Sequence, residues 1–202
     1  MKYAALSPVQ TDISELFPKI IDLFKNIESL EKVRDYQENK THNEESKTDY
    51  VDLMKRHYWR LSKANLQIFK PPTETKEKIL SRFDWLKNID EEPNLGLQLM
   101  SGGSILLPHK DENRASSIIV SVNDSSSFTE FYQEKNLENQ LVPHPDNIIL
   151  KQTCCFGIGE SWLFDNQQVH SVRLNQPIRI NISIGFNKID FKKLCRYALD
   201  QL

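Results

Sequence analysis

The sequence contains few cysteines and no long hydrophobic run. Its three cysteines are the adjacent pair Cys154 and Cys155 and the more distant Cys195, an odd number that argues against a disulfide framework and favours a reducing compartment. No apolar run approaches the roughly 20 residues that a membrane-spanning helix needs. The first fifteen residues also lack the apolar stretch of a signal peptide. We therefore expect a cytoplasmic protein without membrane association.

An excess of basic charge is also missing. Lysine and arginine number 26 against 28 aspartates and glutamates, for a formal net charge of -2. Nucleic-acid-binding proteins normally present a basic surface, so we expect no nucleic-acid partner. With 202 residues, of which 39% are hydrophobic and 27% charged, the chain suits one well-cored soluble domain over residues 1–202.

Residues 1–92 carry helical patterns that predict a helical support region. Apolar residues recur at three- and four-residue spacing from Ser14 onward, with Pro18 tolerable only in a first turn. The polar stretch 34–49 predicts an exposed connecting loop. A second helix is expected from Tyr50 to about Leu61, and a third after Pro72, with Thr73 as its N-cap.

Residues 93–188 instead read as short β-rich runs separated by turns. The run from Ile178 to Phe186 alternates strictly, with apolar residues on one face and Arg179, Asn181, Ser183 and Gly185 on the other. A short amphipathic helix is expected over 189–202. The predicted fold class is therefore mainly β with N-terminal helices, a β-barrel or sandwich buttressed by helices.

Metal-binding chemistry is indicated by His109-Lys110-Asp111, which ends an apolar run. Residues at i and i+2 of a strand point the same way, so His109 and Asp111 can bind one ion. His170 is the best candidate for a second imidazole. Two histidines and one carboxylate form the facial triad of non-haem iron(II) oxygenases, which leaves three coordination positions open. A second such triplet, His144-Pro145-Asp146, lies in a polar segment and is interpreted as a loop.

Arg179 lies nine residues after His170, across a turn predicted at 175–177. Strand and turn can carry both side chains into one cavity. An arginine in an otherwise apolar interior requires an anion, because an unpaired buried charge is costly. A dicarboxylate would satisfy this requirement. Arg173 is the rival residue, although a position at the rim suits it better.

Two segments, SGGSILLPHKD and GESWLFDNQQVHSVRLNQPIRINISIGFN, resemble the iron(II)/2-oxoglutarate-dependent oxygenases, including their prolyl hydroxylase-like and aspartyl/asparaginyl hydroxylase-like branches. Family members commonly carry a Gly six residues before the HxD motif, an aliphatic residue three before it, a Phe six before the distal His, and an Arg or Lys about ten after that His. The matching residues here are Gly103, Leu106, Phe164 and Arg179. Similar small oxygenases occur in bacteriophages, and a bacteriophage origin would place this protein in the host cytoplasm.

The resemblance implies a double-stranded β-helix, the jelly-roll or cupin-like barrel. It also implies Fe(II) held by His109, Asp111 and His170, with O2 and the cosubstrate 2-oxoglutarate, whose distal carboxylate Arg179 would bind. Met100 stands where many relatives place a cosubstrate-binding tyrosine. The remaining expected roles are cosubstrate contacts at Ser183 and Asn181 and substrate contacts at Arg114, Tyr132 and Thr129. Asp165 and Asn166 are expected to form a turn, with a hydrogen bond to His170 as the alternative.

The expected activity is hydroxylation of an unactivated C–H bond in an amino acid or other small metabolite. A residue in a protein or peptide is the alternative substrate. A cupin-like module that binds a metal or ligand without turnover is the alternative of a different class. Succinate formation would separate the oxygenase from that module.

Overall fold

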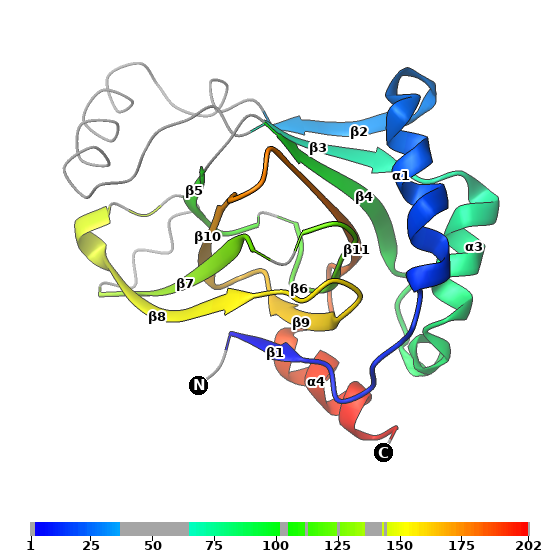
Figure 1. The fold of residues 1–202 in the computed structure, drawn as a ribbon. Helices are drawn as coiled ribbons and strands as arrows, with labels where there is room; N and C mark the ends of the chain where they lie inside the picture. Colours follow the sequence, from blue (N-terminus) through cyan, green and yellow to red (C-terminus); the bar gives the residue numbers. More distant parts are fainter. Residues whose placement is uncertain are drawn as a thin grey trace.

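The computed structural model describes residues 3–36, 65–101, 105–111, 113–124, 126–135, 143 and 145–201. Within these residues two antiparallel sheets lie face to face (Figure 1). The larger, seven-stranded sheet has the order β1 (Ala4–Leu6), β9 (Ser161–Asp165), β6 (Ser116–Ser121), β11 (Ile178–Phe186), β4 (Asn94–Ser101), β3 (Asn65–Lys70) and β2 (Glu31–Tyr36). The smaller has the order β5 (Ile105–His109), β10 (Val169–Arg173), β7 (Phe128–Glu134) and β8 (Ile148–Cys155).

The strands from β4 to β11 wind through both sheets. β4, β6, β9 and β11 form the centre of the larger sheet, whereas β5, β7, β8 and β10 form the smaller one. β11 pairs with both β4 and β6, and β10 pairs with both β5 and β7, so strands distant in sequence become neighbours. This arrangement is the predicted double-stranded β-helix, or jelly roll.

Helices cover the outer face of the larger sheet. α1 (Phe17–Lys25) and α3 (Thr73–Ser81) pack on one side, and α4 (Phe191–Leu199) lies below β9 (Figure 1). Pro18 falls in the first turn of α1 as required. Thr73 is the first residue of α3 rather than its N-cap, which is Pro72. No helix in these described stretches is long and apolar enough to cross a membrane.

The prediction that residues 1–92 are helical was wrong for three segments. β1 pairs with β9, while β2 and β3 extend the larger sheet beyond β4. Long-range pairing with an existing sheet edge overrides weak local patterns there. β2 also includes 34–36, the start of the predicted polar loop. The rest of that loop and the helix predicted from Tyr50 to Leu61 lie outside the described residues.

β11 is the central strand that separates two interiors. Its apolar face carries Ile180, Ile182, Ile184 and Phe186, all buried in the main core against the helices. Its other face carries Arg179, Asn181 and Ser183, which are equally buried but lie between the two sheets. A buried polar face requires polar partners or ligands, so the space between the sheets is where function is expected.

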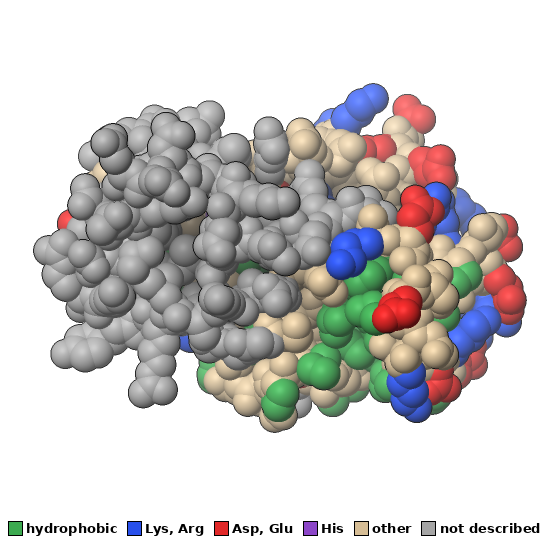
Figure 2. Space-filling view, turned by 90° about the horizontal axis from the view of Figure 1, so that it is seen from above, with side chains coloured by type: hydrophobic (Ala, Val, Ile, Leu, Met, Phe, Trp, Pro, Cys, Tyr) green, Lys and Arg blue, Asp and Glu red, His purple; other side chains and the backbone are tan. Residues whose placement is uncertain are grey.

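The described surface shows no single-sign charge field on the face seen in Figure 2, where Lys and Arg side chains alternate with Asp and Glu. Many of them form exposed ion pairs, such as Lys19 with Glu74 and Lys25 with Asp22. A hollow of about 520 Å³ between α1 and α3 is lined by Lys19, Lys78 and Arg82. Glu74 or Glu15 pairs with each of these cations, so the hollow offers no unpaired charge to a ligand.

Candidate metal centre

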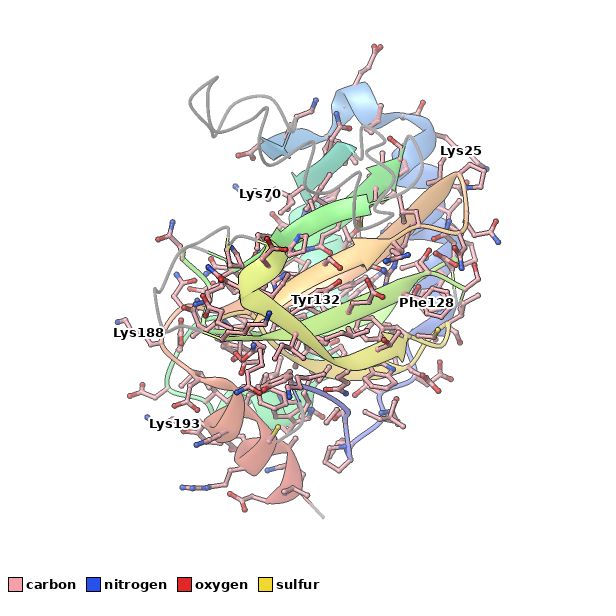
Figure 3. The ribbon with its side chains drawn as sticks, turned by 90° about the vertical axis from the view of Figure 1, so that its left-hand side faces the viewer. Lys25, Lys70, Phe128, Tyr132, Lys188 and Lys193 are labelled. Carbon is pink, nitrogen blue, oxygen red and sulfur yellow. The ribbon has the colours of Figure 1, made fainter. Side chains whose placement is uncertain are left out.

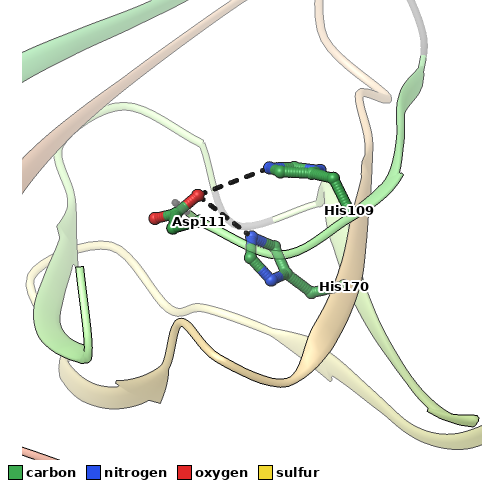
Figure 4. Close-up of side chains that lie close together, drawn as sticks. All are labelled: His109, Asp111 and His170. Atoms are coloured by element: carbon green, nitrogen blue, oxygen red, sulfur yellow. Dashed lines mark ion pairs between the residues drawn. The ribbon is translucent and has the colours of Figure 1, made fainter. Parts of the chain in front are cut away.

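His109, Asp111 and His170 converge at one end of the barrel (Figure 4). β5 ends at His109, and β10 places His170 directly opposite it as its cross-strand partner, with the ring centroids 4.4 Å apart. Asp111 Oδ1 lies 3.5 Å from His109 Nε2 and 4.0 Å from His170 Nε2. One ligand atom from each residue lies within 4.8 Å of the others. Two imidazoles and one carboxylate at these separations can share one metal ion.

The orientation of His170 suits a metal ligand. Its Nδ1 lies 2.8 Å from the backbone oxygen of Gln168, a contact that places the ring proton on Nδ1 and leaves the Nε2 lone pair facing Asp111. Burial, assisted by the nearby His109, lowers the pKa of His170 to about 4 despite the opposite effect of Asp111. His170 is therefore a neutral imidazole at physiological pH, the form that binds metals.

Asp111 is held as a carboxylate. Burial raises its pKa, but the hydrogen bond from His109 and the proximity of His170 and Arg114 outweigh that effect and hold the pKa well below its usual range. The site therefore combines a negative oxygen with a neutral imidazole from His170, a donor set that fits a divalent first-row metal.

Metal-free protein should lose stability as the pH falls from about 6.5 to about 4. The folded state lowers the pKa of His170 to about 4, whereas an unfolded histidine binds its proton near 6.5. The unfolded state therefore binds more protons in this window, which weakens folding by about 1–3 kcal/mol. Urea unfolding in a chelator at pH 7.5 and pH 5 measures the loss, and His170→Gln should reduce it. An equal pH dependence in the variant would assign the effect to other groups.

Aromatic rings surround His170 on the barrel side. Phe164 of β9 makes an edge contact at 4.8 Å between centroids, and Phe131 of β7 lies at 6.1 Å. Phe156 continues this wall, with its ring 6.3 Å from Phe164. Phe164 is therefore a core residue that also borders the metal centre. The wall keeps the environment of His170 apolar, which explains its lowered pKa.

Arg179 projects from β11 into the space between the two sheets, where His170 also lies. It is only 2% exposed, its guanidinium lies 5.4 Å from the centroid of Phe156, and its Nε donates to Asn181 Oδ1 at 3.2 Å. Within the described residues no carboxylate lies within 4 Å of it. Burial lowers its pKa to about 10, with Asp124 opposing the shift, so it stays cationic at neutral pH. A buried cation without a partner carboxylate indicates an anion-binding position.

The other two residues predicted to contact the cosubstrate, Asn181 and Ser183, lie at different distances from the metal centre along β11. Asn181 accepts from Arg179, and its amide lies 3.5 Å from Gln98 Oε1. Ser183 lies nearer the metal centre, where its hydroxyl accepts from Arg114 Nη1 at 3.1 Å. That same Nη1 is 3.8 Å from Asp111 Oδ2. Arg114 therefore lies beside the metal ligands, between Asp111 and Ser183.

Thr129 and Tyr132, both predicted to contact substrate, lie on opposite faces of β7. Thr129 is buried and shares the inward face with Phe131. The Tyr132 hydroxyl instead contacts Ser171 Oγ at 3.0 Å and Glu130 Oε2 at 2.9 Å. Ser171 follows His170 on β10, so its side chain points to the other face of the sheet. Figure 3 labels Tyr132 and Phe128 on the neighbouring strand, β7. This position argues against the prediction that Tyr132 contacts substrate, because alternation along β7 turns it outward.

Asn166 is a site residue whose contact the sequence analysis missed. Its Nδ2 donates to Asp111 Oδ2 at 2.6 Å, rather than to His170 as the alternative expectation had it. Gln167, its neighbour in the β9–β10 turn, donates to the backbone oxygens of Asp111 and Arg114 at 2.9 and 2.7 Å. The polar run after Phe164 signals a turn, but no sequence pattern identifies the loop that this turn contacts.

The second HxD triplet and Met100 can also be placed in part. His144 lies outside the described residues, and Asp146 is exposed in a short 3-10 helix, Pro145–Asn147. Met100 packs with Leu66, Val172 and other buried apolar side chains. Met100 is therefore a core residue at the position where many related oxygenases carry a tyrosine.

Comparisons with protein-family models and with curated proteins find no match. Among solved structures, a Pseudomonas putida prolyl-4-hydroxylase is similar with a TM-score of 0.43 and 14% identity, over 85% of this chain and 98% of that one. Escherichia coli YcfD, a ribosomal oxygenase in complex with cobalt and 2-oxoglutarate, has a TM-score of 0.43 and 16% identity, over 68% of this chain and 37% of that one. Vicilin from Solanum melongena has a TM-score of 0.37 and 13% identity, over 60% and 28%.

The chain thus spans well under half the length of YcfD and of vicilin. At these identities and TM-scores the similarities assign neither an activity nor a ligand to this chain, and none bears on a bacteriophage origin. The side chains inside the barrel carry the functional proposal instead.

Proposed function

We propose that this protein is an iron(II)/2-oxoglutarate-dependent dioxygenase that hydroxylates an unactivated C–H bond of an amino acid or other small metabolite. The observation that carries the proposal is the buried Arg179, which has no carboxylate partner among the described residues and shares one interior with the metal-binding constellation. A metal site alone would suit many proteins. A metal site and a buried cation without a described carboxylate partner, both between the same two sheets, suit a ligand that is an anion at both ends.

The spacing along β11 supports a dicarboxylate cosubstrate. Ser183 bonds to Arg114, which lies beside the metal ligands, so Ser183 is close to the metal centre. Arg179 is four residues from Ser183 on the same face of β11. Four residues of a strand span about 13 Å. The Arg179 side chain and a five-carbon dicarboxylate together can bridge such a distance, with one carboxylate at the guanidinium and the other end at the metal.

The proposed reaction converts 2-oxoglutarate, O2 and a substrate R–H into succinate, CO2 and R–OH. Iron(II), when bound, would supply the oxygen activation that this chemistry requires. His109, Asp111 and His170 would hold it through three positions, leaving three for the reactants. Arg179 would orient the cosubstrate, with Asn181 holding its guanidinium, and the phenylalanine wall would exclude water from that side. Arg114 and Thr129 remain the proposed contacts for substrate.

Succinate formation tests this proposal. Anaerobically purified protein is given iron(II), 2-oxoglutarate and then air, with and without a mixture of free amino acids. Succinate that the mixture stimulates supports the oxygenase and a small substrate. Slow succinate without stimulation keeps the oxygenase but favours a protein or peptide residue as substrate. Absence of succinate from protein shown to hold iron would contradict the oxygenase and favour a binding module without turnover.

A further inference from the structure

The two oxygens of the Asp111 carboxylate have different surroundings. Oδ1 faces the two imidazoles, at 3.5 Å from His109 Nε2 and 4.0 Å from His170 Nε2. Oδ2 faces away from them, accepts a hydrogen bond from Asn166 Nδ2 at 2.6 Å and lies 3.8 Å from Arg114 Nη1. Only Oδ1 is therefore directed at the position that a metal ion would occupy.

Asn166 is rigidly placed for this contact. It is only 3% exposed, and its backbone oxygen accepts a hydrogen bond from the Asp111 N–H at 3.0 Å. Backbone and side chain of Asn166 thus both bond to the same residue. Gln167 adds its two bonds to the backbone of Asp111 and Arg114. The β9–β10 turn, which leads into the strand of His170, therefore also fixes the loop that carries Asp111.

One atom of the Asn166 side chain is in an environment that does not stabilise the fold. Its Oδ1 is buried and has no hydrogen-bond partner among the described residues, a condition that destabilises the folded state. Turning the amide over would not help, because the amide oxygen would then face the Asp111 carboxylate. The fold therefore leaves this carbonyl unsatisfied while it directs one amide N–H at Oδ2 of Asp111. Such local conflicts are expected at functional positions.

Arg114 reaches Asp111 Oδ2 because β11 leaves room for it. A side chain at Gly185 would start 2.8 Å from Arg114 Nε, so the absence of a Cβ there allows the guanidinium to lie against the strand. From this position Nη1 contacts Ser183 and approaches Asp111. The positive charge of Arg114 thus lies on the Oδ2 side of the carboxylate.

We propose that Asn166, assisted by Arg114, is a positioning residue that holds Oδ2 of Asp111 and presents Oδ1 alone to the metal. This inference rests on the metal centre of the proposed function but not on turnover. A carboxylate bound through one oxygen occupies one coordination position, whereas a carboxylate that rotates freely can occupy two. Holding Oδ2 therefore keeps a third position open for cosubstrate and oxygen.

Cobalt(II) titration of the metal-free protein tests the proposal. Asn166→Leu removes the amide and its unsatisfied carbonyl at similar size. We expect it to weaken Co(II) binding by about 10- to 100-fold, in line with the effect of residues that orient metal ligands, and to shift the visible absorption of bound Co(II). The metal-free variant should stay folded, which circular dichroism verifies, with a lower melting temperature because Asp111 Oδ2 loses its hydrogen-bond donor. Asn175→Ala is the matched control, because Asn175 donates to the Ser126 backbone oxygen in a distant turn, and it should change neither Co(II) property.

The outcomes separate the two proposals. If the unaltered protein binds no Co(II), the metal centre itself is wrong and the proposed function fails with it. If the unaltered protein binds Co(II) and Asn166→Leu binds it equally tightly with the same spectrum, the positioning role is overturned while the metal centre stands. A variant whose melting temperature falls and whose Co(II) spectrum is unchanged would show Asn166 to be structural only, which also overturns the role.

Discussion

Replacing Asp111 by alanine should abolish iron binding and succinate formation. Asp111 supplies the only carboxylate among the three grouped ligands, and two imidazoles alone bind iron(II) weakly. Residues that only orient ligands change metal affinity by about 10- to 100-fold, so loss of a ligand should exceed about 100-fold. Iron content after dialysis and succinate formation measure the two effects. Circular dichroism of the metal-free variant verifies that it is folded.

The second HxD triplet offers the matched control for this prediction. His144→Ala and Asp146→Asn should leave iron binding and succinate formation close to those of the unaltered protein. Asp146 is exposed in the 3-10 helix before β8, whereas His109 and His170 lie on β5 and β10 of the same sheet. A folded but inactive H144A protein, together with an active D111A protein, would move the metal site to the second triplet.

Replacing Arg179 by methionine should raise the 2-oxoglutarate requirement strongly and leave iron affinity nearly unchanged. A hydrogen-bonded contact to a charged group contributes about 1.5–3 kcal/mol, which corresponds to roughly a 10- to 150-fold higher concentration for half-maximal succinate formation. The variant should also be at least as stable, because methionine removes a buried charge that has no carboxylate partner among the described residues. Succinate formation against 2-oxoglutarate concentration and thermal unfolding measure both effects.

Arg173→Met is the comparison that tests the assignment of this anion site. Arg173 Nε pairs with Glu130 at 3.1 Å, and its side chain is 39% exposed. Its loss should therefore leave the 2-oxoglutarate requirement unchanged. If Arg173→Met raised that requirement and Arg179→Met did not, the cosubstrate carboxylate would have to be assigned to Arg173.

Local patterns were sufficient where the relevant property repeats within one element. Alternation along residues 178–186 predicted both the strand and the shared face of Arg179, Asn181 and Ser183. The HxD spacing predicted that His109 and Asp111 point to one place. The first inference succeeds because the two-residue period of a strand is set by its own backbone, whatever the strand pairs with. Asp111 lies two residues past the end of β5, and its position also depends on the bonds between its loop and the β9–β10 turn.

Local patterns were insufficient where a contact depends on strand pairing. β1 to β3 became strands because they meet the edges of an existing sheet, although the segment containing them reads as helical. Tyr132 turned away from the metal centre because the register of β7 directs Phe131 inward. The hydrogen bond from Asn166 to Asp111 joins two turns that are far apart in the sequence.

The sequence by itself thus predicted a mainly β fold with helices, the three candidate ligands and Arg179 as the candidate anion-binding residue, from residue types, strand alternation and a family resemblance. Only the tertiary structure decided that His170 lies opposite His109, that Arg179 has no carboxylate partner among the described residues, and that Asn166 holds one oxygen of Asp111. The physical reason is that these contacts join strands and turns through long-range register. That register is selected by the burial of the whole barrel rather than by any local pattern.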